Sequence, residues 1–323
     1  MKFKRLCAAA ALLVASVTIA FAQAYPTRTV TIVVGYPGGT PVDTIARVIA
    51  NKLTERVGHP FIVENKPGAG SSIGAADVVK AAPDGYTLYL SSIANTTYPS
   101  FNKVSFDFAK DLAPISQVCD VPVLLVVPPS GPASVADLIK KAKAEPGALS
   151  FGSSGNGTAT HLFAELFSHE SAIKLAHIPY KGSSQAVVDL LAGRIQMMFS
   201  PAGTVLQYVK AGKLRALAVS GHHRLAELAD VPTFDESGIK HLDFSLWFGL
   251  NTTAGTPKPV IDYLNEQVAA VLNSPDIKAK LVKQMIFPVS TSSEDFGAFI
   301  REDLDRWRKV VEAAGIGPKQ PAK

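Results

Sequence analysis

The stretch TVTIVVGYPGGTPVDTIARVIANKLTERVG, residues 29–58, predicts the unit from which the fold is built. Its first part, Thr29–Val34, is apolar, β-branched and of strand length, which is typical of a buried strand. From Val42 to Gly58 apolar residues recur at helical spacing, and a glycine such as Gly58 commonly ends a helix. A glycine-rich loop joins the two. The stretch therefore predicts a strand, a loop and a helix in direct succession.

The same succession recurs along the chain. Strand-length apolar runs alternate with helical patterns as far as LRALAVS, residues 214–220, and the chain becomes helical after LDFSLWFGLNTT, residues 242–253. This alternation indicates an α/β fold with parallel strands and helices on both faces of the sheet. A chain of 323 residues usually divides into two domains of ~100–200 residues each.

The N-terminus differs in composition from the rest. Three basic residues, Lys2, Lys4 and Arg5, precede an uncharged run, and the small-x-small pattern AFA at residues 20–22 is typical of a cleavage site. We interpret residues 1–22 as a signal peptide, because the apolar run falls short of the ~20 residues of a spanning helix. The alternative is an uncleaved membrane anchor. Cleavage lowers the formal charge from +5 to +2 and leaves Cys119 as the only cysteine.

A secreted α/β chain with two lobes follows the plan of periplasmic binding proteins. We expect each lobe to hold a mostly parallel sheet flanked by helices, with two crossovers between the lobes. The predicted boundaries are residues 23–122 plus 248–323 for the first lobe and 123–247 for the second. The C-terminal helices have no strands of their own, so they should pack on the first lobe. The expected location is the periplasm, and the expected state is a monomer.

A second glycine-rich loop, FGSSGNGTATH at residues 151–161, leaves a predicted strand and enters a helix. It lacks the lysine of a phosphate-binding P-loop, and its glycines do not fit the dinucleotide or nucleophile-elbow spacing. Backbone amides beside a helix N-terminus bind anions, carboxylates included. The loop therefore predicts anion binding by the backbone. A serine hydrolase that uses Ser154 and His161 remains an alternative.

Other classes of site have little support in the sequence. The seven histidines are scattered, and no Cys-x-x-Cys or His-x-x-x-His pattern occurs, so we expect no metal and no cofactor. No basic block favours nucleic acid.

The ordered motifs YPTRTVTIVVGYPGG, ENKPGAGSSIGA, APDGYTLYLSS, LSFGSSGNGTATHL, HIPYKGSSQAVVDLLAGRIQMMFS, GKLRALAVSG and WFGLNTTAGTPKPVIDYLN give a family resemblance. The chain resembles the Bug family, the substrate-binding proteins of tripartite tricarboxylate transporters. The resemblance implies a two-lobed Venus-flytrap receptor, not an enzyme, which holds a small organic carboxylate and delivers it to membrane permease subunits. A sensory receptor that docks on a membrane sensor is the third possibility.

The resemblance also implies which residues bind the ligand, through backbone groups and ordered water. In the first lobe they are Tyr36, Gly38, Gly39, Thr40, Asp43, Ser91 and Ser92. In the second lobe they are Ser153, Ser154, Gly155, Asn156, Gly157, Thr158, His161, Tyr180, Gly182, Ser183 and Ser200. Two departures from the family pattern lie in this set. Asp43 is four residues after Gly39 instead of three, and Ser200-Pro201 replaces the usual Asp-Asn. Whether Asp43 contacts the ligand or only caps a helix is left open.

Overall fold

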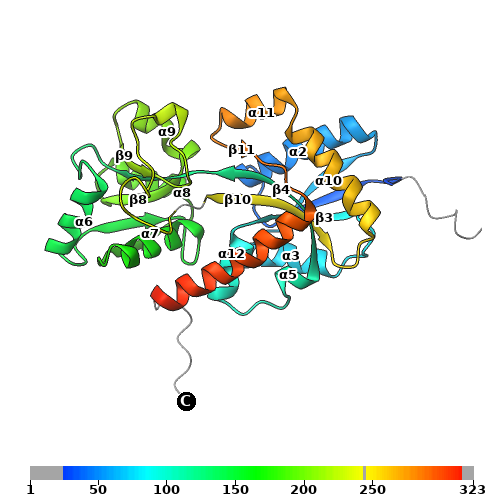
Figure 1. The fold of residues 1–323 in the computed structure, drawn as a ribbon, viewed down its shortest axis with the longest axis horizontal. Helices are drawn as coiled ribbons and strands as arrows, with labels where there is room; N and C mark the ends of the chain where they lie inside the picture. The colour runs from blue at the N-terminus through cyan, green and yellow to red at the C-terminus, as the bar shows by residue number, and fades with distance from the viewer. Residues whose placement is uncertain (1–24, 243–244, 315–323) are drawn as a thin grey trace, which may run out of the picture.

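The structure, a computed structural model, describes residues 25–242 and 245–314. The predicted signal peptide lies outside the described residues. Two sheets lie side by side, one in each lobe (Figure 1). The six-stranded sheet of the first lobe has the order β11-β4-β10-β3-β1-β2, and the five-stranded sheet of the second lobe has the order β7-β6-β8-β5-β9. The two-lobed α/β architecture predicted from the sequence is confirmed.

The elements of the first lobe come from both ends of the chain. Its strands are β1 (Val30–Val34), β2 (Phe61–Asn65), β3 (Thr87–Ser92), β4 (Leu112–Val121), β10 (Leu246–Thr253) and β11 (Phe287–Pro288). Its helices are α2 (Pro41–Val57), α3 (Ser72–Val79), α4 (Ala94–Thr97), α5 (Phe108–Asp111), α10 (Lys258–Leu272), α11 (Pro275–Val282) and α12 (Ser293–Ala314).

The second lobe is a continuous stretch of chain. Its strands are β5 (Val123–Val127), β6 (Ser150–Ser153), β7 (Ala176–Pro179), β8 (Met197–Pro201) and β9 (Arg215–Val219). Its helices are α6 (Val135–Ala144), α7 (Ala159–Glu170), α8 (Ser183–Leu191) and α9 (Ala202–Lys210). Three short 3₁₀ turns complete the described elements of the chain at Ala69–Ser71, Tyr98–Ser100 and Ala226–Leu228.

The stretch that predicted the fold forms β1 and α2. Pro41 occupies the first turn of α2, and Gly58 ends it with a φ of 79°, a left-handed conformation that glycine adopts without strain. Ile45, Ile49 and Leu53 are buried against the sheet in one core cluster with β1 and α10. Burying a side chain of this size contributes about 1.5–3 kcal/mol, so packing of this face holds the helix in place.

Both sheets are mixed, which corrects the expectation of mostly parallel strands. β1 pairs in parallel with β2 and β3, whereas β10 and β11 run antiparallel to their neighbours. In the second lobe β6 pairs in parallel with β7 and β8, but β5 is antiparallel to β8 and β9. The reason is the crossing itself. A strand that enters a lobe from the other lobe runs opposite to the strands of the βα units.

The lobes meet at several places. β4 continues into β5 through Pro122, and the chain returns to the first sheet at β10. A third junction was not predicted: the turn between α11 and β11 buries Met285 in the core of the second lobe, with Leu124, Ala202 and Val205. Helix α12 packs on β4 and α4 of the first lobe and reaches α7 of the second (Figure 1). The ring of Trp307 lies 6.4 Å from that of Phe163. The predicted boundaries between the lobes stay a prediction.

In residues 25–242 and 245–314, no helix has the length and apolar character needed to cross a bilayer. Cys119 is fully buried in β4, and burial raises the pKa of its thiol well above the ordinary value.

Candidate functional site

The strand registers place the glycine-rich loops of both lobes at the edges that face each other. In the first sheet Phe248, near the start of β10, pairs with Ser92 at the end of β3, so the carboxyl ends of β1–β3 lie at the crossing edge. In the second sheet Val123, the first residue of β5, pairs with Pro201 at the end of β8. The carboxyl ends of β6–β8 therefore also lie at the crossing edge. Ligands of open α/β sheets bind outside these ends.

The first loop, residues 35–40, joins β1 to α2 and contains four predicted site residues: Tyr36, Gly38, Gly39 and Thr40. Gly39 has a φ of 81°, and no atom outside its chain neighbours lies within 4 Å of the position a Cβ would take. Gly38 and Gly39 are exposed. The Thr40 hydroxyl donates to the Pro37 carbonyl at 2.9 Å, which closes the loop on itself. The backbone of the loop thus stays accessible in a fixed turn.

Asp43 holds the first loop from behind. Its carboxylate accepts hydrogen bonds from the Gly39 amide at 2.9 Å, the Asn65 amide group at 2.9 Å and the Arg47 Nε at 3.0 Å. The residue is 3% exposed. The Arg47 guanidinium, ahead of the other two donors, lowers the pKa of the Asp43 carboxyl to about 2. Each oxygen of the carboxylate has protein partners, which supports a positioning role for Asp43.

The floor beside this loop is a buried network of hydroxyl and amide groups. Tyr36 and Ser92 share a hydrogen bond of 2.9 Å, and Asn95 accepts from the Ser92 amide at 2.9 Å. Asn95 also donates to Ser71 at 3.1 Å and to Tyr89 at 2.9 Å. Burial raises the pKa of both tyrosine hydroxyls, so they act as neutral donors and acceptors. Sequence reasoning missed Ser71, Tyr89 and Asn95, although Ser71 lies in the glycine-rich stretch GAGSSIGA, because only the tertiary structure brings the three side chains together.

Ser91 does not join this floor, contrary to expectation. Its hydroxyl donates to the Gly249 carbonyl at 2.9 Å and lies 2.6 Å from the Asn251 side-chain oxygen. Successive residues of a strand point to opposite faces, so Ser91 and Ser92 cannot both point at the same surface. Ser91 instead links β3 to β10.

The second loop, residues 154–158, is shaped by its own hydrogen bonds. Gly155 has a φ of 132° and Gly157 a φ of 71°, both in the range that favours glycine. The Thr158 hydroxyl donates to the Gly155 carbonyl at 2.7 Å, and the Ser154 amide donates to Thr160 Oγ1 at 2.9 Å. Asn156 is exposed at the tip of the loop. Thr158 occupies the N-cap position of α7, but its hydroxyl does not cap the helix within the described structure.

A stack of rings supports the second loop from below. The ring centroids of His161 and His177 lie 4.0 Å apart, and that of Phe151 lies 4.7 Å from His177 and 6.2 Å from His161, with all three rings nearly parallel. His161 Nδ1 accepts from the Gly157 amide at 3.2 Å, so its Nε2 carries the proton. His177 Nε2 lies 2.6 Å from the buried Ser153 hydroxyl. Partial burial, and after it the electrostatic influence of the neighbouring His161, lowers the pKa of His177 to about 4.

This arrangement does not favour the hydrolase alternative. The Ser154 hydroxyl is hydrogen-bonded to Thr160 at 2.9 Å, and the two polar atoms of the His161 ring face Gly157 and Glu165. No hydrogen bond joins Ser154 to His161 among the described residues. His177, which sequence reasoning missed, is the histidine that contacts a serine of this region. Ser153, its partner, is 0% exposed and therefore closed to a substrate.

The remaining predicted residues lie on the next two strand ends of the second lobe. Tyr180 follows β7, and its hydroxyl donates to Asp189 at 2.7 Å. Gly182 and Ser183 form the start of α8. Ser200 is buried at the end of β8, where its hydroxyl donates to the Pro201 carbonyl at 3.3 Å. Of these residues Gly182 and Ser183 offer the more accessible groups.

The helices that begin at the two facing edges share an electrostatic feature. In the described part of the chain α3, α7, α8 and α9 start without a side-chain cap. Their first-turn amides therefore lack a side-chain acceptor, and each helix N-terminus carries roughly half a positive charge. The site can attract an anion without a lysine or arginine in either loop.

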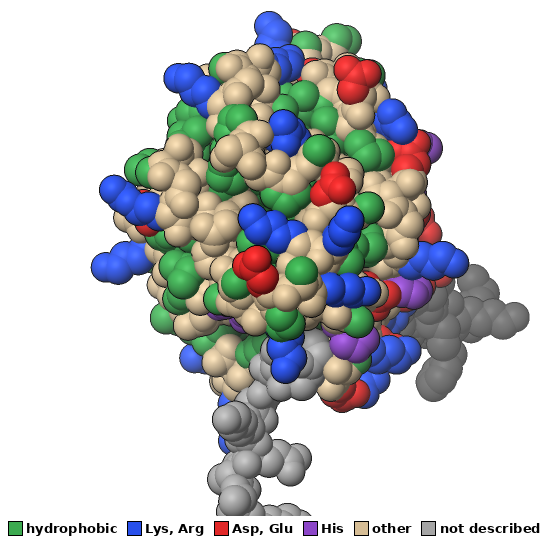
Figure 2. All heavy atoms as spheres, turned by 90° about the vertical axis from the view of Figure 1, so that its left-hand side faces the viewer, with side chains coloured by type: hydrophobic (Ala, Val, Ile, Leu, Met, Phe, Trp, Pro, Cys, Tyr) green, Lys and Arg blue, Asp and Glu red, His purple; other side chains and the backbone are tan. Residues whose placement is uncertain are grey.

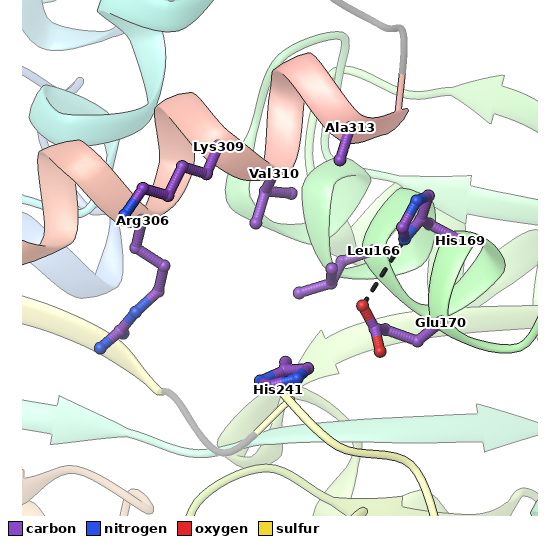
Figure 3. A pocket seen from close by; sticks show the side chains of 8 residues that line it. All are labelled: Leu166, His169, Glu170, His241, Arg306, Lys309, Val310 and Ala313. Carbon is purple, nitrogen blue, oxygen red and sulfur yellow. Dashed lines mark ion pairs between the residues drawn. The ribbon is translucent and has the colours of Figure 1, made fainter.

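Among the described residues, the outer end of the second lobe shows no large patch of a single charge (Figure 2). Figure 2 shows Lys and Arg side chains scattered among acidic and apolar ones over the outer end of the second lobe. Figure 3 shows a shallow hollow of about 240 Å³ between α7 and α12, lined by Leu166, His169, Glu170, His241, Arg306, Lys309, Val310 and Ala313. It contains none of the predicted site residues. No group of three metal-ligating side chains occurs within residues 25–242 and 245–314.

Comparison with known proteins agrees with this geometry. Residues 45–316 match the tripartite tricarboxylate transporter family receptor, TctC. Protein BugT of Bordetella pertussis is 35% identical over 98% of this chain and 99% of its own length. A structure of an R. palustris protein with adipate superposes with a TM-score of 0.81 at 34% identity, and covers 91% of this chain and 99% of that one. The structure of MatC from Rhodopseudomonas palustris with bound malate superposes with a TM-score of 0.77 at 27% identity, and the match covers 89% of this chain and 100% of MatC. The chain belongs to the tripartite tricarboxylate transporter receptor family.

Proposed function

We propose that the protein captures a small organic carboxylate between its two lobes and delivers it to the membrane permease subunits of a tripartite transporter. Membership of the receptor family supports this function, and relatives of the same fold are described with adipate and with malate. The observation that carries the proposal is the pair of glycine-rich loops, one from each lobe, at the edges that face each other across the crossings.

Backbone groups supply the binding chemistry. The accessible amides of the first loop and the uncapped first turns of α7 and α8 act as donors toward a carboxylate. Hydrogen bonds to a charged group contribute about 1.5–3 kcal/mol each, roughly twice the value for neutral pairs, and ordered water can extend them. A few such bonds, shared between two lobes, give selective binding without a formal counter-charge.

Ligand binding favours a state in which both loops contact the ligand. The lobes are joined by Pro122, by the return into β10 and by the Met285 turn, so a closing rotation would bend these junctions and shift the contact between α12 and α7. A ligand shifts such an equilibrium only through contacts that differ between the open and closed states. The second set of backbone donors supplies this difference.

The setting of this function is also a proposal. The signal peptide predicted at residues 1–22 supports export to the periplasm, where a monomeric receptor would meet its permease. A binding role without turnover fits the absence of a hydrogen bond between Ser154 and His161 in the described structure. We propose that residues 35–40 and 154–158 contact the ligand, together with Gly182 and Ser183, and that buried Ser92 supports Tyr36 through their hydrogen bond.

A thermal-shift screen of the mature protein tests the proposal. The panel contains di-, tri- and aromatic carboxylates, amino acids and nicotinate. A ligand present at 100 times its Kd adds ~2.7 kcal/mol to the free energy of unfolding. We expect a clear shift with one or a few carboxylates and no product by mass spectrometry. Ester hydrolysis that is lost in Ser154→Ala would overturn the proposal in favour of an enzyme.

A further inference from the structure

A mainly apolar cavity lies beside the candidate site, between the two lobes. Its volume is about 330 Å³, and it is lined by Pro41, Ile45, Val121, Pro201, Gly203, Thr204, Leu246, Phe248, Lys283, Gln284 and Ile286. We call it the inter-lobe cavity. The first lobe, the second lobe and the turn between α11 and β11 each contribute to its wall, so its shape depends on how the lobes are placed.

The inter-lobe cavity adjoins the candidate site at three points. Pro41 directly follows Thr40 of the first loop, and Pro201 directly follows Ser200. Phe248 pairs across the sheet with Ser92 of the polar floor. A ligand whose carboxylate is held at the first loop would therefore have the cavity within reach of its other end.

The residues that line the cavity determine which kind of ligand group can bind there. Ile45, Phe248 and Ile286 are buried and apolar, and two prolines offer no backbone amide. An engineered apolar cavity of 150 Å³ holds benzene, so about 330 Å³ has room for a ring or a chain of several methylenes. Lys283 is exposed at the wall and forms no ion pair with the residues that the structure describes.

Close backbone packing fixes one side of the cavity. A Cβ on Gly203 would lie 2.4 Å from the Gln284 carbonyl oxygen, so α9 and the turn before β11 are in direct contact. This contact keeps the second-lobe wall near the first-lobe wall. The cavity is therefore a half-open pocket at the junction of the lobes, with two of its walls held in fixed positions.

We propose that the inter-lobe cavity receives the apolar part of the ligand, so that the preferred ligand is a carboxylate with an extended alkyl or aryl group. Lys283 pairs with a second acidic group where the ligand carries one at its far end. This inference rests on the proposed function, because the first carboxylate must be held by the facing loops. It narrows the ligand class from carboxylates in general to those with an apolar spacer.

Titration calorimetry with a series of chain lengths tests the inference. The probes are acetate, butyrate, hexanoate, octanoate and phenylacetate, with malonate, adipate and suberate as diacids. Affinity should rise about fourfold for each added methylene that enters the cavity, until the cavity is filled. Affinity that is independent of length would overturn the inference, even if every acid binds.

Two pairs of variants locate the effect. Thr204→Phe fills the cavity, and Gln207→Phe adds the same ring to the exposed side of the same helix. We expect Thr204→Phe to weaken octanoate and phenylacetate binding at least tenfold with less than a twofold change for malonate, and Gln207→Phe to change neither. Lys283→Gln should weaken suberate but not octanoate, whereas Lys280→Gln should change neither.

The outcomes separate this inference from the proposed function. If Thr204→Phe weakens all acids equally, or none, the cavity is not a subsite while the facing loops still stand. If no acid of any length binds the wild-type protein, the proposed function fails and the inference fails with it. Should Thr204→Phe not fold, Thr204→Leu and the wild-type length series decide the question.

Discussion

Replacing Asp43 by asparagine tests whether this residue shapes the first loop or contacts the ligand. The substitution keeps the size of the side chain but removes the negative charge that accepts hydrogen bonds from Gly39, Arg47 and Asn65. The pKa of Asp43 is lowered from 3.8 to about 2, and one pKa unit corresponds to 1.36 kcal/mol. The charge therefore contributes about 2 kcal/mol of stability at neutral pH. Asparagine also places an amide where Arg47 or the Gly39 amide needs an acceptor, so we expect a loss of ~2–3 kcal/mol.

The pH dependence of this stability has a definite sign. The folded pKa is lower than the unfolded one, so the contribution is full above pH 3.8 and is lost as the pH falls through about 2. Chemical denaturation of wild type and Asp43→Asn should therefore differ by the same amount at pH 5 and pH 7. Asp77→Asn is the matched control, since its ion pair with Lys66 is exposed and should contribute at most ~1 kcal/mol.

Ligand titration of the same variant completes the test. Because the loop loses its support, we expect Asp43→Asn to weaken carboxylate binding and to lower stability together. Unchanged stability with strongly weakened binding would refute this reasoning and assign Asp43 a direct contact. Unchanged stability with unchanged binding would show that the first loop holds its shape without the charge.

Three further predictions follow from backbone strain and buried titratable groups. Gly157→Val and its control Gly147→Val each place a valine in a left-handed backbone conformation with open space around it, which should lower the free energy of unfolding by ~1–2 kcal/mol in both. Calorimetry should show weaker ligand binding for Gly157→Val alone. Equal affinities of the two variants would show that residue 157 is not part of the ligand site. Burial raises the pKa of Asp120 from 3.8 to about 6, so its charged form destabilises the folded state above pH 6. Asp120→Asn should therefore raise the free energy of unfolding by ~1–3 kcal/mol above pH 6 and by little below pH 4. An unchanged free energy of unfolding by denaturant at pH 7.5 would contradict this prediction. The pKa of His177 is lowered from 6.5 to about 4, so protonation of this ring favours the unfolded state. Between pH 6.5 and pH 4 the free energy of unfolding of the wild type should fall by ~1–2 kcal/mol more than that of His177→Gln, a value that takes the partial exposure of the ring into account. Parallel plots of the free energy of unfolding against pH for the two proteins would contradict this prediction.

Local sequence patterns predicted the elements that carry the site. Apolar periodicity from Ile45 to Leu53 placed α2, and Gly58 marked its end, because both signals act within one helix. The glycine-rich loops could be recognised from composition alone, since only glycine adopts the positive φ values of Gly39 and Gly157 without strain. The two-lobed plan followed from the repetition of these units.

Features that depend on distant parts of the chain could not be predicted. The stack of His161 and His177 joins residues on different elements, and no spacing rule connects them. The pairing of Asn95 with Ser71 and the insertion of Met285 into the second lobe likewise arise from tertiary packing. Ser91 was misplaced although strand alternation alone could have separated it from Ser92. The strand directions of β5 and β10 followed from the crossings, which composition does not reveal.

Calorimetric comparison of a carboxylate with its primary amide tests the central claim most directly. The claim is that backbone donors from both lobes hold a negatively charged ligand group. Bonds to a carboxylate exceed those to a neutral acceptor by about 1 kcal/mol each, so two or three such bonds predict a preference of ~30-fold or more for the acid over an amide of the same shape. The account predicts saturable binding of one acid per chain with this preference. Equal affinity for the acid and the amide would contradict it.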